Sequence, residues 1–407
     1  MSRRDAGVPR EVRAAVAHLD PPFGVVDLGA FRANAGDLVR RARGVPIRVA
    51  TKSVRIRELL AATLERPGFA GVLAYTLPEA LWLVEQGFDD VVVGYPTAHR
   101  AALGALAADE RAARSVTLMV DDVAQLDLVD AVTPPGRRPE IRICLELDAA
   151  FRTAGGAVRF GAWRSPVGTP DAAVRLARAV VARPGFALVG LMAYEGQIAG
   201  VGDAGRGPRA IAVRAMQRAS AAELAERRAA VVAAVRRVAD LEFVNGGGTG
   251  SLETTTSEAA VTEVTAGSGL LGSGLFDTYR AFRPRPASWF VLPVVRRPTR
   301  GVVTVLGGGW VASGPPGHDR LPSVAHPPGL AYVAREAAGE VQTPLRGRAA
   351  RRLAVGDHVW FRHAKAGEGA EHLGAVVAVD SASRTADGAA AVVGELATYR
   401  GEGQAFL

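Results

Sequence analysis

Short apolar runs alternate with amphipathic helical stretches over the first two-thirds of the chain. Runs that predict strands lie at Gly24–Asp27, Ile47–Ala50, Gly71–Ala74, Val91–Val93, Val116–Val120, Ile141–Leu147, Leu188–Ala193 and Phe243–Asn245. Helical periodicity falls at Leu28–Arg43, Arg55–Glu65, Pro78–Gln86, Ala98–Ala108, Thr169–Ala182 and Ala210–Ala239. Strands separated by helices predict βαβ units and a parallel sheet. Eight such strands favour an α/β fold of the (β/α)8 TIM-barrel type.

The pattern changes after about Glu263, where Gly- and Pro-rich connections separate short β-type runs. These runs lie at Trp289–Val295, Gly301–Val305, Glu340–Gln342, His358–Arg362 and Gly374–Val379. They predict a C-terminal antiparallel β domain. We therefore expect three parts: residues 1–22, an N-terminal segment that packs on the β domain; residues 23–275, the barrel; and residues 276–407, the β domain. The first strand is a further candidate for the β domain.

Composition describes an ordinary globular protein, with 48% hydrophobic and 22% charged residues among 407. The net charge of +8 is carried by arginines scattered among alanines and acids, which argues against a nucleic-acid footprint. Cys144, the single cysteine, lies in an apolar run and is expected to be a core thiol. No apolar run of about 18 residues occurs, so we expect a cytoplasmic protein without a membrane partner.

Lysine is nearly absent from the chain. Of 49 basic residues only Lys52 and Lys365 are lysines. An arginine stays protonated, whereas a partly desolvated lysine can lose its proton and form a Schiff base with a carbonyl group. Lys52 directly follows the predicted strand that ends in Ala50 and Thr51, at the C-terminal end of what is predicted as the second barrel strand. This position favours Schiff-base chemistry over a plain surface lysine.

A glycine-rich loop follows the last predicted barrel strand. It runs from Asn245 to Ser251 and contains Gly246, Gly247 and Gly248 in succession, followed by Thr249. Consecutive glycines expose backbone N–H groups, and barrels place phosphate sites after their late strands. A second turn, Gly267-Ser268, comes about twenty residues later and could complete a phosphate site.

An amine nucleophile and a phosphate site in one barrel mouth fit either a phosphorylated substrate or pyridoxal 5′-phosphate (PLP). The order of motifs separates the two. The stretch Val25–Asn34, then Lys52, then the glycine-rich loop and the Gly267-Ser268 turn resembles the alanine racemase-like, fold type III PLP enzymes. Leu191–Gly196, together with a C-terminal β domain ending in a histidine-containing strand, is similar to the D-serine dehydratase and D-threonine aldolase branch.

The resemblance implies roles for individual residues. Lys52 would hold the cofactor and move a proton at the substrate Cα, and Tyr194 would line the pocket. Arg152 would lie beside the pyridine ring, with Arg164 as the competing candidate. The phosphate group would be bound by Gly247, Gly248, Thr249, Gly267 and Ser268.

The chain departs from this branch near its C-terminus. The branch holds a divalent metal through a histidine and, two residues on, a cysteine or aspartate, whereas here the pair reads His363 and Lys365. An ammonium group cannot ligate a cation. Lys365 would then replace the metal's charge in polarising the substrate, which is the interpretation we favour. Otherwise a shifted metal site would use His363 with Glu368, Glu371 or His372, or Lys365 would only pair with an acid.

The resemblance implies a lyase that acts on a small D-β-hydroxy amino acid, by D-serine-type dehydration or D-threonine-type retro-aldol cleavage. One alternative is an amino-acid racemase, which needs a second base, and Tyr279 or Tyr332 are the candidates. Another is a non-catalytic PLP-binding protein. We further expect a homodimer.

Overall fold

The computed structural model describes residues 7–153, 158–315 and 317–407, and the chain forms two compact units. The barrel unit comprises Leu38–Lys52, Ala61–Gly267 and Phe406–Leu407. The sheet unit comprises Met1–Asp37, Ser53–Leu60 and Ser268–Ala405, of which residues 1–6 and 316 lie outside the described part. Lys52 is therefore the last residue of a barrel segment, and Ser53 begins a segment of the sheet unit.

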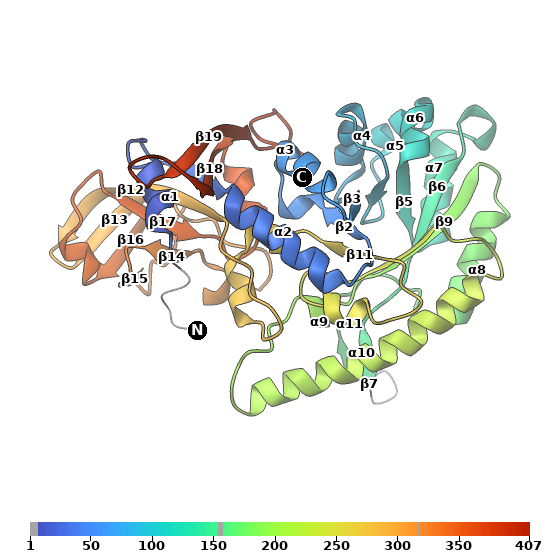
Figure 1. Cartoon of the computed structure of the whole chain (residues 1–407). Coiled ribbons are helices and arrows are strands. Elements are labelled where there is room, and N and C mark those ends of the chain that lie inside the picture. The colour runs from blue at the N-terminus through green and yellow to red at the C-terminus, as the bar shows by residue number, and fades with distance from the viewer. Residues whose placement is uncertain (1–6, 154–157, 316) are drawn as a thin grey trace. The chain divides into compact units, whose positions relative to one another are not determined.

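The barrel unit is a closed ring of eight parallel strands, as expected (Figure 1). Around the ring the strands are β2 (Ile47–Ala50), β3 (Phe69–Ala74), β4 (Val91–Val93), β5 (Val116–Val120), β6 (Ile141–Glu146), β9 (Phe186–Ala193), β10 (Phe243–Gly246) and β11 (Glu263–Ala266). Seven coincide with apolar runs predicted above. The eighth, β11, is a short strand in a Thr-rich stretch, where the apolar pattern is weak.

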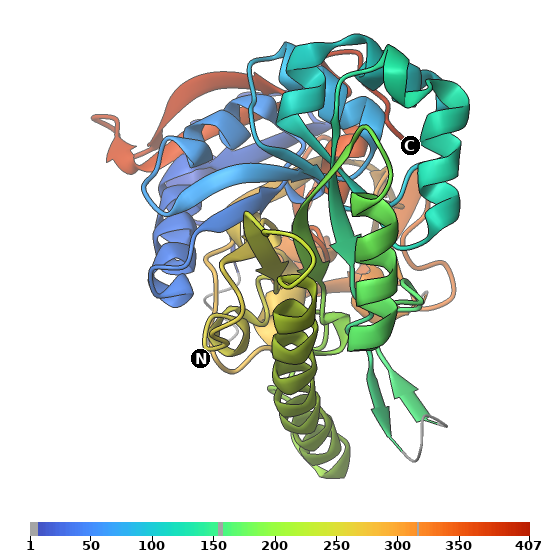
Figure 2. The ribbon, with the colours of Figure 1, turned by 90° about the vertical axis from the view of Figure 1, so that its right-hand side faces the viewer.

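Helices connect the barrel strands. They are α4 (Leu77–Glu85), α5 (Arg100–Ala108), α6 (Glu110–Ser115), α7 (Val123–Val132), α8 (Pro170–Val181), α9 (Gly196–Ala199), α10 (Pro208–Val235) and α11 (Leu252–Thr255). Thr169 caps α8 by accepting a hydrogen bond from the Ala172 backbone N–H, with Pro170 at the first helical position. Figure 2 shows the long helix α10 and a two-stranded hairpin, β7 (Phe151–Thr153) with β8 (Val158–Phe160), both extending beyond the barrel strands.

Two helices cross the boundary between the units: α2 (Leu28–Ala42) and α3 (Arg57–Leu64). None of the helices in the described ranges is long and apolar enough to span a bilayer. Cys144 is fully buried in β6, as expected of a core thiol, and burial raises the pKa of its thiol.

The sheet unit is built on nine strands. They are β1 (Phe23–Asp27), β12 (Ser288–Thr299), β13 (Val302–Leu306), β14 (Ser323–His326), β15 (Leu330–Tyr332), β16 (Gln342–Gly347), β17 (His358–Arg362), β18 (Ala375–Arg384) and β19 (Ala390–Ala397). The unit also contains the short helices α1 (Arg10–Ala15) and α12 (Ser268–Leu271). All strand pairs are antiparallel except β1 with β18.

The strand β1 corrects one expectation. Its run Gly24–Asp27 was predicted as the first barrel strand, but it pairs with β12 and β18 in the sheet unit. A single buried apolar run does not reveal which sheet it joins, because a strand buried on both faces looks alike in either. The strand before Lys52 is therefore the first barrel strand and not the second. The alternative, that the first strand joins the β domain, is confirmed.

Candidate active site

Three neighbouring barrel strands carry the predicted site residues at their C-terminal ends. Strand β11 pairs with β10 on one side and with β2 on the other, and all three are parallel. Gly247 directly follows β10, Gly267 directly follows β11, and Lys52 follows β2 within a short 3-10 turn. Parallel neighbours end at the same rim of a barrel, which is where the active sites of this architecture lie.

Lys52 takes part in a group of polar and aromatic side chains. Its Nζ donates a hydrogen bond to the Tyr95 hydroxyl at 2.6 Å. The Arg164 guanidinium lies over both the Tyr95 ring, at 5.2 Å, and the Tyr194 ring, at 5.0 Å. The group thus joins Lys52 after β2, Tyr95 after β4, Tyr194 after β9 and Arg164 from the connection between β6 and α8. The Lys52 side chain is exposed, whereas its position at a strand end led us to expect a partly desolvated amine.

The charges in this group change the acidity of its neighbours. Burial raises the pKa of Glu146 to about 7, against the opposing effect of Arg164, whose guanidinium lies 3.7 Å from its carboxylate. Burial alone would raise the pKa of Tyr95, but the ammonium of Lys52 and the guanidinium of Arg164 lower it overall. Burial raises the pKa of Tyr194 to about 12. The rim therefore contains an acid that titrates near neutrality and a tyrosine that is more acidic than usual.

The glycine-rich loop requires glycine at two positions. Gly247 has a φ of +82°, a left-handed conformation that side chains disfavour. A Cβ on Gly248 would lie 2.9 Å from the Ala199 Cβ and 3.1 Å from the Tyr194 ring. The loop backbone is thus packed directly against the ring of Tyr194, which leaves no room for a side chain between them.

The buried ion pair of Glu195 and Arg228 contacts the same loop. Glu195 accepts hydrogen bonds from the Gly247 backbone N–H at 3.3 Å, from the Ser251 hydroxyl at 2.8 Å and from the Thr255 hydroxyl. It pairs with Arg228, which is fully buried, lies 2.9 Å away and also pairs with Glu258. Because both carboxylate oxygens accept hydrogen bonds, the loop is held in one conformation.

A second arginine holds the loop from its other side. Arg41, at the end of α2, donates to the Thr249 carbonyl oxygen at 2.7 Å and to the carboxylate of Glu253 at 2.6 Å. The loop is therefore held by contacts from Arg41 as well as from Glu195.

The structure separates the two candidate arginines. Arg152 lies on the β7–β8 hairpin, where its side chain is 50% exposed and pairs with Asp148 at 2.6 Å. Arg159 on the same hairpin also donates to Asp148, at 2.9 Å. The structure thus brings Arg164, and not Arg152, to the group around Lys52. The sequence did not show that the connection after β6 folds into a hairpin that carries Arg152 outward.

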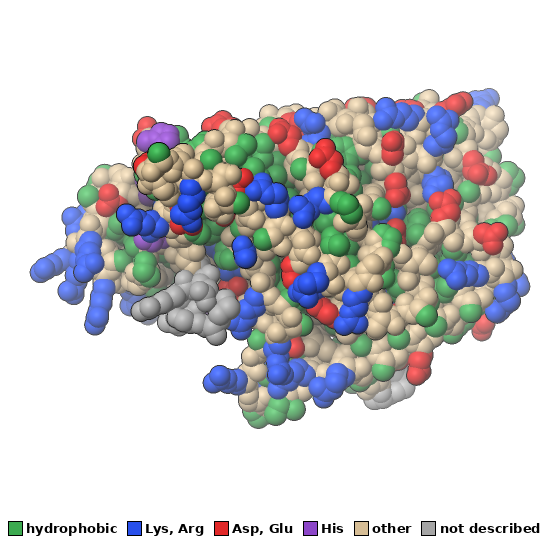
Figure 3. All heavy atoms as spheres, viewed as in Figure 1, with side chains coloured by type: hydrophobic (Ala, Val, Ile, Leu, Met, Phe, Trp, Pro, Cys, Tyr) green, Lys and Arg blue, Asp and Glu red, His purple; other side chains and the backbone are tan. Residues whose placement is uncertain are grey.

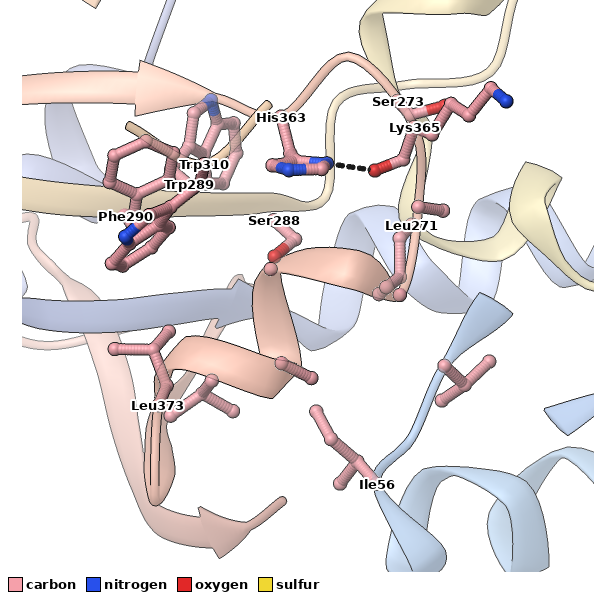
Figure 4. A pocket seen from close by; sticks show the side chains of 16 residues that line it. Ile56, Leu271, Ser273, Ser288, Trp289, Phe290, Trp310, His363, Lys365 and Leu373 are labelled. Atoms are coloured by element: carbon pink, nitrogen blue, oxygen red, sulfur yellow. Dashed lines mark hydrogen bonds between the residues drawn. The ribbon is translucent and has the colours of Figure 1, made fainter. Parts of the chain in front are cut away.

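In the sheet unit, His363 and Lys365 line a cavity of about 50 Å3 (Figure 4). The His363 Nδ1 contacts the Lys365 carbonyl oxygen, and its Nε2 is buried without a hydrogen-bond partner among the described residues. Burial lowers the pKa of His363. Lys365 donates to the Ser313 carbonyl oxygen at 2.6 Å, and its amine points away from Trp289, Phe290 and Trp310.

The segment that follows Lys52 lines this same cavity. Val54 and Ile56, both in the sheet unit, are among its lining residues. Between them Arg55 adopts a φ of +55°, which is unusual for a residue other than glycine. Its guanidinium pairs with Glu371 at 2.5 Å, and its carbonyl oxygen accepts from the Tyr399 backbone N–H at 3.0 Å. The chain at Arg55 is thus tied to the 3-10 turn Glu368–His372 and to the residues after β19.

The alternative metal ligands have other partners. Glu368 accepts from the Ser313 hydroxyl at 2.6 Å, Glu371 pairs with two arginines, and the His372 ring stacks on Trp310 at 4.8 Å. Within the described residues no group of three or more His, Cys, Asp or Glu side chains is arranged to hold a metal ion.

The two candidate racemase bases are also engaged. Tyr279 is 3% exposed and packs against Phe276 and Phe282. The Tyr332 hydroxyl donates to the Pro322 carbonyl oxygen at 2.6 Å, and burial raises the pKa of this tyrosine well above its usual value. A tyrosine with a raised pKa is a poor proton acceptor at neutral pH.

Sequence reasoning missed several residues of the rim. Tyr95 follows β4 directly after Gly94, and Glu146 ends β6; both could have been found as polar residues at strand ends. Glu195 is part of a motif noted above, but its role in supporting the loop depends on Arg228 from α10, which no local pattern shows.

These residues fit a phosphorylated aldehyde cofactor. They offer an exposed amine, a glycine-rich loop in which Gly248 has no room for a Cβ, and an arginine beside two aromatic rings. The Glu195 carboxylate, which accepts from the Gly247 N–H, pairs with Arg228, and Arg228 also pairs with Glu258. The fold and site thus define a closed parallel barrel whose rim carries a lysine and a glycine-rich loop.

Residues 26–274 match the family described as alanine racemase, N-terminal domain, and the chain belongs to that family, a family of PLP-binding barrels. The chain is 30% identical over 258 residues to 3-hydroxy-D-aspartate aldolase of Paracoccus denitrificans, a match that covers 62% of this chain and 60% of that protein. It is 28% identical over 342 residues to D-threonine aldolase of Arthrobacter sp, covering 80% of each.

Solved structures share the fold. The crystal structure of D-threonine aldolase from Filomicrobium marinum superimposes with a TM-score of 0.77 at 23% identity, covering 96% of this chain and 97% of that one. The agreement extends over both the barrel and the sheet strands, because nearly the whole chain is covered.

Proposed function

We propose that this chain is a PLP-dependent lyase that acts on a small D-β-hydroxy amino acid. The two relatives above are aldolases of 3-hydroxy-D-aspartate and D-threonine, and the second is matched over most of its length. Because both relatives are aldolases, we favour retro-aldol cleavage. Dehydration, which acts on the same two substrate carbons, is the alternative.

One observation carries the proposal. The Lys52 amine donates a hydrogen bond to the Tyr95 hydroxyl, and both residues follow barrel strands at the same rim as the glycine-rich loop. Lys52 would hold the cofactor covalently, and the backbone of Gly247, Gly248 and Thr249, with Gly267 and Ser268, would bind its phosphate group. Tyr194, packed on Gly248, would line the pocket. When bound, PLP supplies an electron sink for the bonds broken at Cα.

The residues around Lys52 would then transfer protons to and from the substrate. The Lys52 amine, once released by the substrate, gives or takes a proton at Cα. Tyr95, with a lowered pKa and a 2.6 Å bond to the Lys52 Nζ, relays that proton. We assign the role beside the pyridine ring to Arg164 in place of Arg152, because Arg164 lies over both rim tyrosines. An arginine there does not give up a proton, which would keep the ring nitrogen unprotonated and moderate the electron sink.

Both reactions depend on the β-hydroxyl group of the substrate. In retro-aldol cleavage the hydroxyl loses its proton while the Cα–Cβ bond breaks, which gives glycine and an aldehyde. In dehydration the Cα–H and Cβ–O bonds break, water leaves, and hydrolysis yields a keto acid and ammonium. Each reaction needs a group that polarises the hydroxyl or accepts its proton.

We assign that polarising role to Lys365, with His363 beside it. Lys365 Nζ is oriented by Ser313, through the carbonyl oxygen at 2.6 Å and the hydroxyl at 3.2 Å. A fixed ammonium attracts developing negative charge on oxygen, as a divalent cation would. The buried ring of His363 offers a second polar contact beside Lys365.

Product analysis tests the proposed function. PLP-loaded protein should release glycine and acetaldehyde from D-threonine, or pyruvate and ammonia from D-serine, and Lys52→Ala should do neither. Interconversion of D- and L-alanine without either lyase reaction would instead indicate the racemase, which Tyr279 and Tyr332 are poorly placed to support. PLP binding with no turnover of any of these substrates would support a non-catalytic PLP protein. The homodimer and the cytoplasmic location stay predictions.

A further inference from the structure

Helix α1 presents two unlike faces. Val12, Ala15 and Val16 are buried in a core cluster of the sheet unit. The opposite stripe carries Arg10 and Arg13 at a spacing of three residues, as successive turns of one helix face.

This arginine stripe lines an open pocket of about 320 Å3 within the sheet unit. The other side of the pocket is formed by His326 at the end of β14 and by His358 and Trp360 on β17. Ala14 and Ala17 also line it, and their small side chains leave the space open. The volume lies in the range of small-molecule sites, which is about 300–1,000 Å3.

Among the described residues that line the pocket, two are arginines and none is an acid. Neither Arg10 nor Arg13 forms an ion pair with any residue in the described part of the chain, and the Arg13 Nε is buried without a hydrogen-bond partner there. The nearest acid in sequence, Glu11, is engaged elsewhere, in a 2.8 Å pair with Arg384. Arg10 is exposed and Arg13 is partly buried, so two positive charges face the pocket and favour an anion there.

The histidine in contact with Arg13 adds a neutral donor. Arg13 Nη1 donates to the His326 Nε2 at 2.9 Å, and burial together with Arg13 lowers the pKa of His326 to about 4. His326 is therefore uncharged at neutral pH. Because its Nε2 accepts a hydrogen bond, the proton of the neutral ring lies on Nδ1.

We propose that this pocket is a binding site for a small oxyanion, phosphate or carboxylate, held by the guanidinium groups of Arg10 and Arg13. A planar guanidinium matches the oxygens of either group through paired N–H donors. The site would be separate from the cofactor's phosphate loop, since every residue that lines it belongs to the sheet unit. The proposal does not depend on the proposed lyase activity.

Calorimetric titration of the PLP-loaded full-length protein tests this. Inorganic phosphate is the first probe, malonate and acetate test carboxylates, and chloride controls for ionic strength. Loading with PLP keeps the glycine-rich loop from binding the probe. We expect phosphate or malonate to bind with a dissociation constant near or below about 1 mM. Arg13→Gln should weaken binding at least ten-fold, about 1.4 kcal/mol, while the exposed Arg296→Gln should leave it unchanged.

A second variant keeps the test valid if Arg13→Gln fails to fold. Ala14→Glu places a carboxylate in the pocket, next to Arg13 and one helical turn from Arg10. It should abolish phosphate and malonate binding and raise the melting temperature at low salt. Equal affinity of the wild-type protein, Arg13→Gln and Ala14→Glu would overturn the proposal, as would the absence of binding by every oxyanion. Tighter binding of phosphate than malonate would identify a phosphoryl ligand, and the reverse a carboxylate.

Discussion

The buried pair of Glu195 and Arg228 makes a sharp prediction about the glycine-rich loop. Glu195 accepts on both oxygens: one faces the Ser251 and Thr255 hydroxyls, and the other faces Arg228 at 2.9 Å and the Gly247 N–H at 3.3 Å. In Glu195→Gln the new amide can turn its NH2 toward the hydroxyls, which can rotate to accept. The remaining amide oxygen, which carries no negative charge, then accepts the hydrogen bond from Arg228.

The loss of stability follows from the charged hydrogen bonds that the substitution weakens. Hydrogen bonds to charged groups contribute about 1.5–3 kcal/mol, and Arg228 keeps its other acid, Glu258, at 2.5 Å. We therefore expect Glu195→Gln to destabilise the barrel unit by about 2 kcal/mol. For a unit of this size that corresponds to a fall of roughly 4–8 °C in melting temperature. The loop should also lose order, so the affinity for PLP should fall.

The assay is thermal unfolding of the cofactor-free protein followed by a PLP titration. The matched control is Glu110→Gln, which changes an exposed pair with Arg114 and should shift stability by less than about 0.5 kcal/mol. If Glu195→Gln and Glu110→Gln melt at the same temperature and bind PLP equally, the loop does not depend on the buried pair and the reasoning is wrong.

Three further predictions concern the rim and the sheet unit. Because the pKa of Glu146 is raised from its ordinary value of 4.5 to about 7, the folded state binds more protons than the unfolded state between these values. Stability should therefore fall as pH rises from about 4.5 to 7, by up to about 1.4 kcal/mol per pKa unit, and Glu146→Gln should flatten that dependence in melts taken across the range. Gly248→Ala should raise the dissociation constant for PLP at least ten-fold, because its Cβ would meet Ala199 at 2.9 Å; unchanged affinity in a fluorescence titration would contradict this. Lys365→Met should lower kcat about 100-fold or more while PLP binding stays intact, and a chelator should leave wild-type activity unchanged; full inactivation by the chelator would reject charge replacement.

Much of the fold was predictable because barrel strands are continuous apolar runs between amphipathic helices. The exceptions have local causes. Glu263–Ala266 is short and polar, so its strand was missed, and β1 was assigned to the wrong sheet because nothing in Gly24–Asp27 shows its pairing partners. Strand pairing is decided by contacts far apart in sequence, which a single chain does not display.

The candidate site shows the same limit. The rarity of lysine and the strand end before it drew attention to Lys52, and three consecutive glycines revealed the loop. Neither feature could show that Tyr95 would bond to Lys52, or that Arg152 would lie on a hairpin away from it. Over the barrel part of the face in Figure 3, blue and red side chains are interspersed.

Covalent trapping at Lys52 tests the central claim most directly. Borohydride reduction of the PLP-loaded protein, followed by peptide mass spectrometry, should place a phosphopyridoxyl group on Lys52 and abolish lyase activity. Lys365, the other lysine of the chain, is the internal control and should carry no label. A label on Lys365 alone, or a fully active enzyme after complete reduction, would contradict the assignment of Lys52 as the cofactor lysine.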